Sequence, residues 1–220
     1  MKSIGVFIPA RLSSERLPGK LTKPFAGTTL IDVALERLHD VKYPIGKYLL
    51  AYDHDIVCRN TYPDIKTIHR SEESANSGEP LLHVLADLTQ IKEDYLFFLN
   101  PCLALLKSET IDKALDFFAG DTAESMTSVV RHHTWFFDAE TGTCLTSINY
   151  KELDSKLTVP VVSIASAFHV ISKKTFFETG RFLNENTYLY EIPINESFDV
   201  NDPQDFFVTE TLYIGRKKFL

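Results

Sequence analysis

Short apolar runs alternate with amphipathic segments along most of this chain, and no other feature limits its fold as strongly. Five runs have the length and composition of strands: 3–9, 48–52, 65–69, 95–99 and 126–131. Segments with apolar residues at helical spacing lie between them, at 29–41, 80–91 and 108–118. Because strands that alternate with helices form a mainly parallel sheet covered on both faces, we predict an α/β, Rossmann-like fold.

The pattern changes after the fifth run. Short segments between 135 and 158 surround Gly142, which predicts a hairpin and a small β excursion from the main sheet. A further strand is expected at 161–171, followed by a short helix that Ser172 caps. The last helix is expected to begin at Asp202 and Pro203, with Asp205 in its first turn.

Length, composition and charge limit the class of protein. The 220 residues, 44% of them hydrophobic and without a repeat or linker, indicate a single domain over 1–220. A net charge of −7 argues against a general nucleic-acid binder. No run approaches the roughly 20 apolar residues of a membrane span. Three scattered cysteines and a first segment too short for a signal peptide predict a cytoplasmic protein with reduced thiols.

The loop after the first predicted strand, PARLSSERLPGK at 9–20, is the most informative segment. In an open α/β sheet, ligands bind beyond the carboxyl ends of the strands. The cations Arg11, Arg16 and Lys20 suit phosphate oxygens, and Gly19 lets the backbone approach a ligand closely. The alternative is a solvated basic loop with a proline turn, since such residues are common in loops.

The order R-x-x-S-x-R-L-P-G-K, which runs here from Arg11 to Lys20, resembles the signature loop of the cytidylyltransferases that activate acidic sugars. This group includes the CMP-sialic acid synthetases, the CMP-3-deoxy-manno-octulosonate synthetases and relatives in surface-polysaccharide synthesis. The resemblance implies a nucleotidyltransferase that transfers CMP from CTP to a sialic-acid-like sugar and releases pyrophosphate. It also implies electrostatic stabilisation of the departing pyrophosphate by Arg11 and Lys20, the catalytic residues.

The same resemblance implies a nucleotide site around this loop. Backbone near Ala10 and Arg11 would face the cytosine, and Arg70, after the third strand, matches a family arginine near the base. Ser77 matches a nearby serine more loosely. The expected nucleotide-binding residues are Ala10, Arg11, Ser14, Arg16, Gly19, Lys20, Arg70 and Ser77.

The segment SFDVNDPQDF at 197–206 resembles the family stretch that supplies magnesium ligands. Asp199 matches the first metal carboxylate, whereas Asn201 replaces the second and offers a neutral carbonyl oxygen. Magnesium commonly uses one or two carboxylates together with substrate phosphates, so Mg²⁺ is the expected cofactor. The alternative for Asp199 is a simple strand end, and Asp202 is interpreted as a helix cap.

The chain departs from the family pattern where the sugar is expected to bind. LNPCLALL at 99–106 stands in place of the sialic acid synthetase pattern L-Q-P-T-S-P-L-R, and Asn100 is the expected substrate contact. The family pattern N-G-A-x-Y corresponds here to Ala165 through His169, and His169 is interpreted as a packed core residue. These changes leave open which sugar is activated.

Weaker candidates remain. Adjacent His132 and His133 on a strand point to opposite faces, which disfavours a shared metal. Solvated charge is the commoner role for the possible sugar-carboxylate contacts, which are Arg131, Lys151, Lys156 and Arg181. By resemblance to the sialic acid synthetases, 135–158 is expected to form a dimerisation arm of a homodimer. Two alternatives stay open: a relative that acts on a different sugar, and a catalytically impaired homologue that binds nucleotide without turnover.

Overall fold

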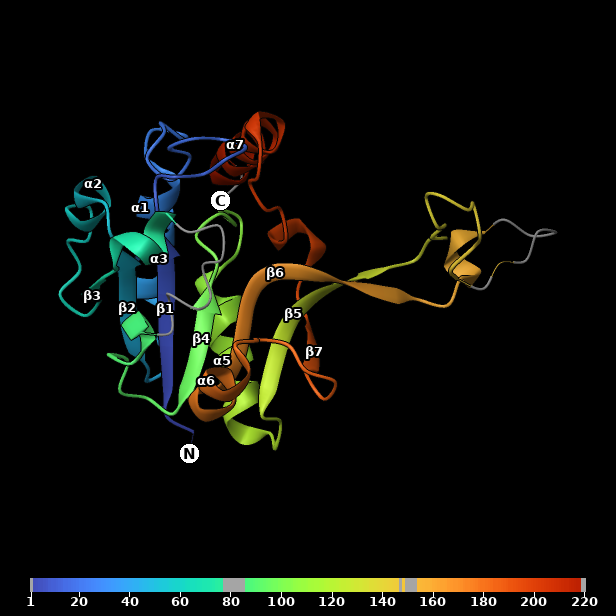
Figure 1. Ribbon diagram of the computed structural model, residues 1–220. Helices are drawn as coiled ribbons and strands as arrows, with labels where there is room; N and C mark the ends of the chain where they lie inside the picture. The colour runs from blue at the N-terminus through green and yellow to red at the C-terminus, as the bar shows by residue number, and fades with distance from the viewer. Residues whose placement is uncertain (1, 77–85, 147, 149–153, 219–220) are drawn as a thin grey trace.

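A computed structural model describes residues 2–76, 86–146, 148 and 154–218. Within these ranges the strands form one seven-stranded sheet in the order β3-β2-β1-β4-β6-β5-β7 (Figure 1). The strands are β1 (Ile4–Ala10), β2 (Gly46–Ala51), β3 (Lys66–His69), β4 (Tyr95–Leu99), β5 (Ser125–His132), β6 (Val161–Ser172) and β7 (Tyr188–Glu191). Strand β6 runs antiparallel to both of its neighbours, and the other pairings are parallel. The mainly parallel α/β sheet is therefore confirmed.

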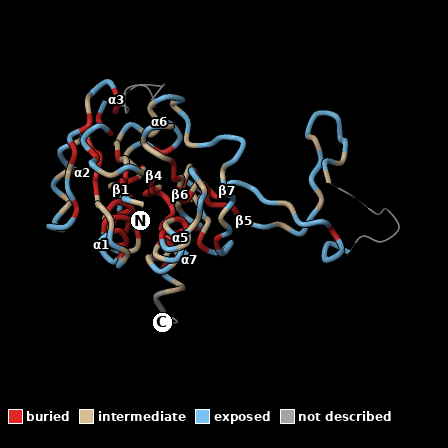
Figure 2. The backbone as a smooth tube through the Cα atoms, turned by 90° about the horizontal axis from the view of Figure 1, so that it is seen from below, coloured by how far each residue is buried: buried red, intermediate tan, exposed pale blue. Residues whose placement is uncertain are grey.

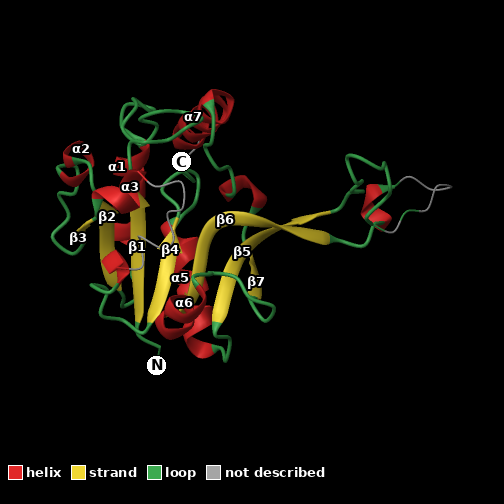
Figure 3. Cartoon of the chain, in the orientation of Figure 1, coloured by secondary structure: helices red, strands yellow, loops and turns green. Residues whose placement is uncertain are grey.

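Helices cover both faces of this sheet (Figure 3). They are α1 (Leu30–Asp40), α2 (His54–Val57), α3 (Glu72–Asn76), α5 (Ser108–Gly120), α6 (Lys173–Thr179) and α7 (Pro203–Lys218), with 3-10 turns at Ser155–Leu157 and Ile194–Glu196. Strand β1 shows the two faces: Val6 and Ile8 pack with α1 and α5, and Phe7 packs with α6 on the other side. Among the described residues, no helix has the length and apolar character needed to cross a bilayer.

The helix ends agree with the local sequence signals. Ser172 Oγ accepts a hydrogen bond from the Thr175 N–H (3.1 Å), as expected of a helix cap. Asp202 Oδ1 accepts hydrogen bonds from the N–H groups of Gln204 (2.8 Å) and Asp205 (2.9 Å), which confirms the predicted start of α7. Of the helix expected at 80–91, residues 80–85 lie outside the described residues, and 86–88 are helical.

Strands β5 and β6 continue beyond the body of the sheet as a two-stranded ribbon that carries the excursion (Figure 1). The excursion is exposed along most of its length (Figure 2). Phe137 and Cys144 form an antiparallel bridge, and Gly142 between them adopts a φ of 69°. This confirms the turn predicted near Gly142.

An irregularity in β6 separates its body half from its arm half. The register with β5 shifts between Thr127, which pairs with His169, and Val129, which pairs with Ile164. Ser128 Oγ holds the extra residues, because it donates to the Phe168 carbonyl and accepts from the Ala167 and Phe168 N–H groups. Within this bulge Ser166 has a φ of 53°, a conformation that costs free energy for a residue other than glycine.

His169 packs within the sheet, in agreement with its interpretation as a core residue. Its Nδ1 lies 2.7 Å from the Thr127 hydroxyl, and its ring lies 5.7 Å from the Phe98 ring and 5.9 Å from the Phe182 ring. Burial lowers the pKa of this imidazole from 6.5 to about 4. His169 is therefore neutral over the range in which an exposed histidine gains its proton.

This burial predicts an acid-dependent loss of stability. As the pH falls from 6.5 towards 4, the unfolded chain takes up a proton on His169 before the folded chain does. The free energy of unfolding should fall by up to about 3 kcal/mol over that interval through this residue. Urea unfolding at a series of pH values should show this loss in the wild type and in His133→Phe, whose histidine is exposed. A His169→Phe variant with the same pH dependence as the wild type would contradict the prediction.

Candidate functional site

The predicted site residues gather at one edge of the sheet, where the parallel strands end. Ala10 is the last residue of β1, and Asp53, Arg70 and Asn100 closely follow β2, β3 and β4. The carboxyl ends of neighbouring parallel strands lie together, and open α/β sheets bind ligands there. The loop after β1 rises from this edge beside α7 (Figure 1).

The loop 11–20 is an ordered turn. The Leu12 carbonyl accepts hydrogen bonds from the N–H groups of Ser14 (2.8 Å) and Gly19 (3.0 Å), and Gly19 has the positive φ of 66° that this turn requires. The Leu12 N–H donates to Asp53 Oδ2 (2.9 Å), which anchors the loop to the end of β2. The loop therefore has a defined backbone conformation.

Two cations of this loop reach the segment before α7. Lys20 Nζ donates to the Val200 carbonyl at 2.6 Å, and the Arg16 guanidinium donates to Asn201 Oδ1 at 2.8 Å. The partners are 180 and 185 positions apart in the sequence. The fold thus joins the two segments from which the sequence predicted a phosphate site and a metal site.

Asp199 lies within hydrogen-bond distance of two side-chain amides. Asn201 Nδ2 donates to its Oδ2 at 3.1 Å, and Asn100 Nδ2 is 3.4 Å from its Oδ1. The expected sugar contact, Asn100, therefore lies beside the expected metal ligands. The Val200 N–H also donates to the Cys102 carbonyl (3.2 Å), which ties this segment to the turn after β4.

Arg11 and Arg70 lie on the side of the site near α3. Arg11 donates to the Ala75 carbonyl at 3.2 Å, and Arg70 donates from Nε to Ser74 Oγ and from a terminal nitrogen to the Ser74 carbonyl, both at 2.7 Å. Burial, and then the positive charge of Arg11, lower the pKa of Arg70. Ser14 contributes the backbone contact described above, and Ser77 lies outside the described residues.

Arg37 is a structural member of the site that the sequence analysis did not single out. It lies on the buried face of α1, where its guanidinium donates to the carbonyls of Asn100 (3.2 Å), Leu103 and Leu106 (3.5 Å). Burial lowers the pKa of this group to about 10. A charge on the apolar face that begins at Leu30 was the available signal, since position 37 follows position 30 by two helical turns. Arg37 thus fixes the turn that presents Asn100.

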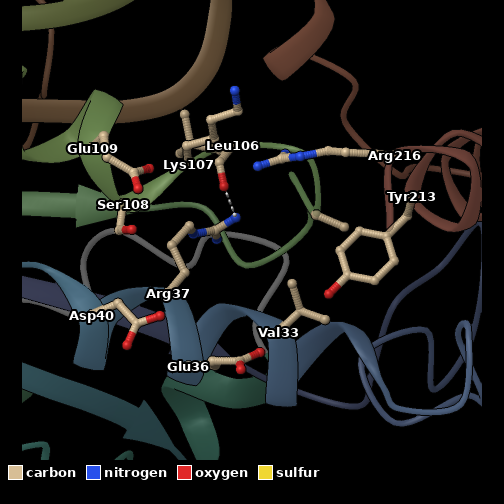
Figure 4. Close-up of a pocket in the computed structure, with 11 residues that line it drawn as sticks. Val33, Glu36, Arg37, Asp40, Leu106, Lys107, Ser108, Glu109, Tyr213 and Arg216 are labelled. Atoms are coloured by element: carbon tan, nitrogen blue, oxygen red, sulfur yellow. Dashed lines mark hydrogen bonds between the residues drawn. The ribbon is translucent and has the colours of Figure 1, made fainter. Parts of the chain in front are cut away.

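A cavity of about 240 Å³ lies behind that turn, between α1, the start of α5 and α7 (Figure 4). Arg37, Lys107 and Arg216 line it together with Glu36, Asp40 and Glu109, and Figure 4 shows Arg37 directed at the Leu106 carbonyl. None of the residues predicted to bind substrate, nucleotide or metal lines it. The cavity wall carries three cationic and three anionic side chains, so its charge does not favour binding of an anion.

The weaker candidates have structural partners. His132 Nε2 lies 2.8 Å from the Ser163 hydroxyl, and Arg131 forms an ion pair with Glu191 at 2.8 Å. Lys156 and Arg181 are exposed, and Lys151 lies outside the described residues. In the part of the chain that the structure describes, no three histidine, cysteine, aspartate or glutamate side chains gather as a metal site.

Comparisons with known proteins identify the family and the fold. Residues 6–194 match the family model described as cytidylyltransferase. The CMP-N,N'-diacetyllegionaminic acid synthase of Legionella pneumophila subsp. pneumophila (strain Philadelphia 1) is 24% identical, over 93% of this chain and 94% of its own length.

Two solved structures show the same fold. A CMP:2-keto-3-deoxy-manno-octonic acid synthetase complexed with CTP superposes with a TM-score of 0.69 at 14% identity, over 99% of this chain and all of that chain. The 2-C-methyl-D-erythritol 4-phosphate cytidylyltransferase of Francisella tularensis gives a TM-score of 0.64 at 12% identity, over 96% of this chain and 99% of its own.

The geometry predicts unequal roles for Lys20, the last residue of the loop, and Lys23, three residues after it. Lys20→Met removes the charge that contacts the Val200 carbonyl, whereas Lys23→Met removes an equal charge from an exposed position. Isothermal titration with CTP should show roughly ten- to hundredfold weaker binding for Lys20→Met, the range expected when a charged hydrogen bond is lost. Lys23→Met should bind like the wild type. Equal losses in the two variants would mean that the loop acts only through its overall charge.

Proposed function

Because the chain belongs to the cytidylyltransferase family, a family of nucleotidyltransferases, we propose that it transfers CMP from CTP to a hydroxyl of an acidic sugar and releases pyrophosphate. The observation that carries this proposal is the contact between the cationic loop and the Asp199 segment. Phosphoryl transfer needs little covalent help from a protein, but it needs positioning and neutralisation of negative charge. A site that brings two cations of one loop to the Asp199 segment, with Arg11 of the same loop near α3, meets that need.

The residues divide the work by position. Arg16 is exposed and reaches across to Asn201, so its guanidinium is available to the triphosphate tail. Lys20, held by the Val200 carbonyl, would place its ammonium next to charge that develops on the leaving pyrophosphate. Arg11, at the end of β1, would hold the phosphates from the α3 side.

The donor set around Asp199 fits Mg²⁺ only with help from the nucleotide. One carboxylate and a nearby amide oxygen are few ligands, but magnesium usually completes its shell with water and substrate phosphates. Asp199 would hold the ion, with Asn201 as a second oxygen donor. When bound, Mg²⁺ would neutralise phosphate oxygens, a role that suits the proposed transfer.

For the acceptor we propose a sialic-acid-like keto acid that belongs to surface-polysaccharide synthesis. This rests on the relative that makes a CMP-linked acidic sugar and on the position of Asn100 beside Asp199. The positions that follow Pro101 carry small or aliphatic side chains here, and all of Cys102, Leu103, Ala104, Leu105 and Leu106 are buried. They belong to the core, so the polar contacts to the sugar must come from other residues.

The test is pyrophosphate release with CTP, Mg²⁺ and a panel of acceptors: N,N'-diacetyllegionaminic acid, N-acetylneuraminic acid and 3-deoxy-manno-octulosonate. We expect release with one of the nine-carbon acids and with CTP in preference to ATP, GTP and UTP. Binding of CTP without turnover on any acid would instead support a catalytically impaired homologue. Turnover with 3-deoxy-manno-octulosonate alone would overturn the proposed sialic-acid-like acceptor.

We further propose that the arm joins two copies of the chain in a homodimer. Large apolar side chains are exposed on the arm (135–158) and on the adjoining part of β6, which form a ribbon that stands away from the body (Figure 1). Among the described residues they are Phe136, Phe137, Leu145 and Leu157 in the arm, and Val159, Val162 and Ile164 just after it. Exposed apolar groups gathered on one projecting element are typical of a protein interface. A second copy with the same arm is the partner that this interpretation requires.

Light scattering during gel filtration tests this assignment. The wild type should have the mass of a dimer, and Leu157→Asp should have that of a monomer, because a buried unpaired carboxylate strongly destabilises an interface. Phe207→Asp is the matched control, since Phe207 is similarly exposed but lies on α7. A monomeric wild type, or dissociation by the α7 change alone, would contradict the arm as interface.

A further inference from the structure

We propose that Arg16 and Asn201 form a latch that keeps Asp199 from binding a divalent cation until a phosphate group takes Arg16. The inference rests on the proposed function, since it requires a phosphorylated ligand at the loop after β1. It goes further by assigning an order: the phosphates engage first, and the metal ligands become available as a result. The residues involved are the neighbours of Asp199.

The orientation of the Asn201 amide is set by a charged donor. Arg16 donates to Asn201 Oδ1 at 2.8 Å, so the amide oxygen must face the loop. The other end, Nδ2, then faces Asp199 and lies 3.1 Å from its Oδ2 and 3.3 Å from its carbonyl oxygen. With Arg16 in place, Asn201 presents hydrogen atoms to Asp199. A cation needs oxygen at that place.

The second neighbour of Asp199 is oriented in the same way. The Cys102 N–H donates to Asn100 Oδ1 at 2.9 Å, which directs Nδ2 of Asn100 towards the Ser166 carbonyl (3.0 Å) and Asp199 Oδ1 (3.4 Å). Both carboxylate oxygens of Asp199 therefore have an amide hydrogen nearby. Asn100 is held by backbone and cannot turn easily, whereas Asn201 is held on its oxygen side by one exposed side chain.

The local charge opposes a free cation as well. Arg16 and Lys20 contact the two residues that follow Asp199. Another carboxylate of this segment, that of Asp205, accepts hydrogen bonds from the backbone N–H groups of Asn201 and Asp202. The positive charges of Arg16 and Lys20 repel an incoming divalent cation. Magnesium also gives up its bound water reluctantly. In the state that the structure shows, Asp199 is thus a poor cation site.

Phosphate binding would change both the orientation of the Asn201 amide and the positive charge near Asp199. Arg16 is exposed, and a guanidinium prefers a phosphate oxygen to a neutral amide oxygen because the charged hydrogen bond is stronger. When Arg16 moves its hydrogen bond to a phosphate, Asn201 can rotate and present Oδ1 beside Asp199. The phosphates also cancel the positive charge of the loop. Ligand binding would thereby convert the amide from a hydrogen-bond donor into a metal ligand.

Mn²⁺ is a suitable probe, because electron paramagnetic resonance distinguishes the free from the bound ion without any turnover. In protein without nucleotide, we expect weak Mn²⁺ binding by the wild type. Asn201→Asp should bind at least about tenfold more tightly, since a second carboxylate replaces the amide. The control Asn195→Asp adds the same charge four positions from Asp199 at an exposed site, and it should behave as the wild type does.

The latch itself is tested by removing Arg16. Arg16→Met should strengthen Mn²⁺ binding by the nucleotide-free protein several-fold, whereas Lys23→Met, which removes an equal charge from an exposed position three residues after the loop, should not. Tight Mn²⁺ binding by the free wild type, or equal gains in the paired variants, would overturn the latch. Those results would leave the proposed function intact. Failure of the wild type to bind CTP at all would instead remove the function on which the latch rests.

Discussion

Two hydrogen bonds, from Lys20 to the Val200 carbonyl and from Arg16 to Asn201, join the loop after β1 to the segment before α7. The arrangement of this end of the sheet depends on them. The positive charges of Arg11, Arg16 and Lys20 on one short loop repel one another. The groups that accept hydrogen bonds from Arg16 and Lys20 come from the C-terminal part of the chain. The two contacts fix the positions of Arg16 and Lys20. Because their partners are a neutral amide oxygen and a backbone carbonyl, the loop keeps its positive charge and can still attract an anion.

The buried guanidinium of Arg37 stabilises the turn after β4, which lies next to this contact. Arg37 donates to three carbonyl groups of the turn after β4. In this turn the Cys102 N–H donates to Asn100 Oδ1, and the Cys102 carbonyl accepts from the Val200 N–H. A buried arginine is costly, and the carbonyl dipoles together with the negative charge of Glu196 offset part of that cost. The turn and the helix therefore depend on each other. A substitution at Arg37 would therefore disturb Asn100 and Asp199, although Arg37 itself is not expected to contact a substrate.

The sequence could predict what depends on local signals. Apolar runs gave the strands, and the caps Ser172 and Asp202 gave two helix starts, because neighbouring residues determine both. The antiparallel direction of β6, its bulge at Ser166 and the edge strand β7 arise from tertiary pairing, which no local pattern carries. The cationic loop and Asp199 were each recognised, but the orientation of the Asn201 amide depends on an arginine 185 positions away. Arg37 was missed because its role lies in carbonyl contacts that spacing alone does not show.

Strand β6 links the site to the arm. Ser128 holds the bulge closed, and within it the strained Ser166 directs its carbonyl to Asn100 at 3.0 Å. Beyond the same bulge the strand leaves the body and becomes one side of the arm. Strain of this kind persists only where the surrounding contacts fix the backbone, and here β5 supplies them. Strand β6 therefore carries both the Ser166 carbonyl that contacts Asn100 and one side of the arm, so the backbone joins the neighbourhood of Asp199 to the arm through the bulge.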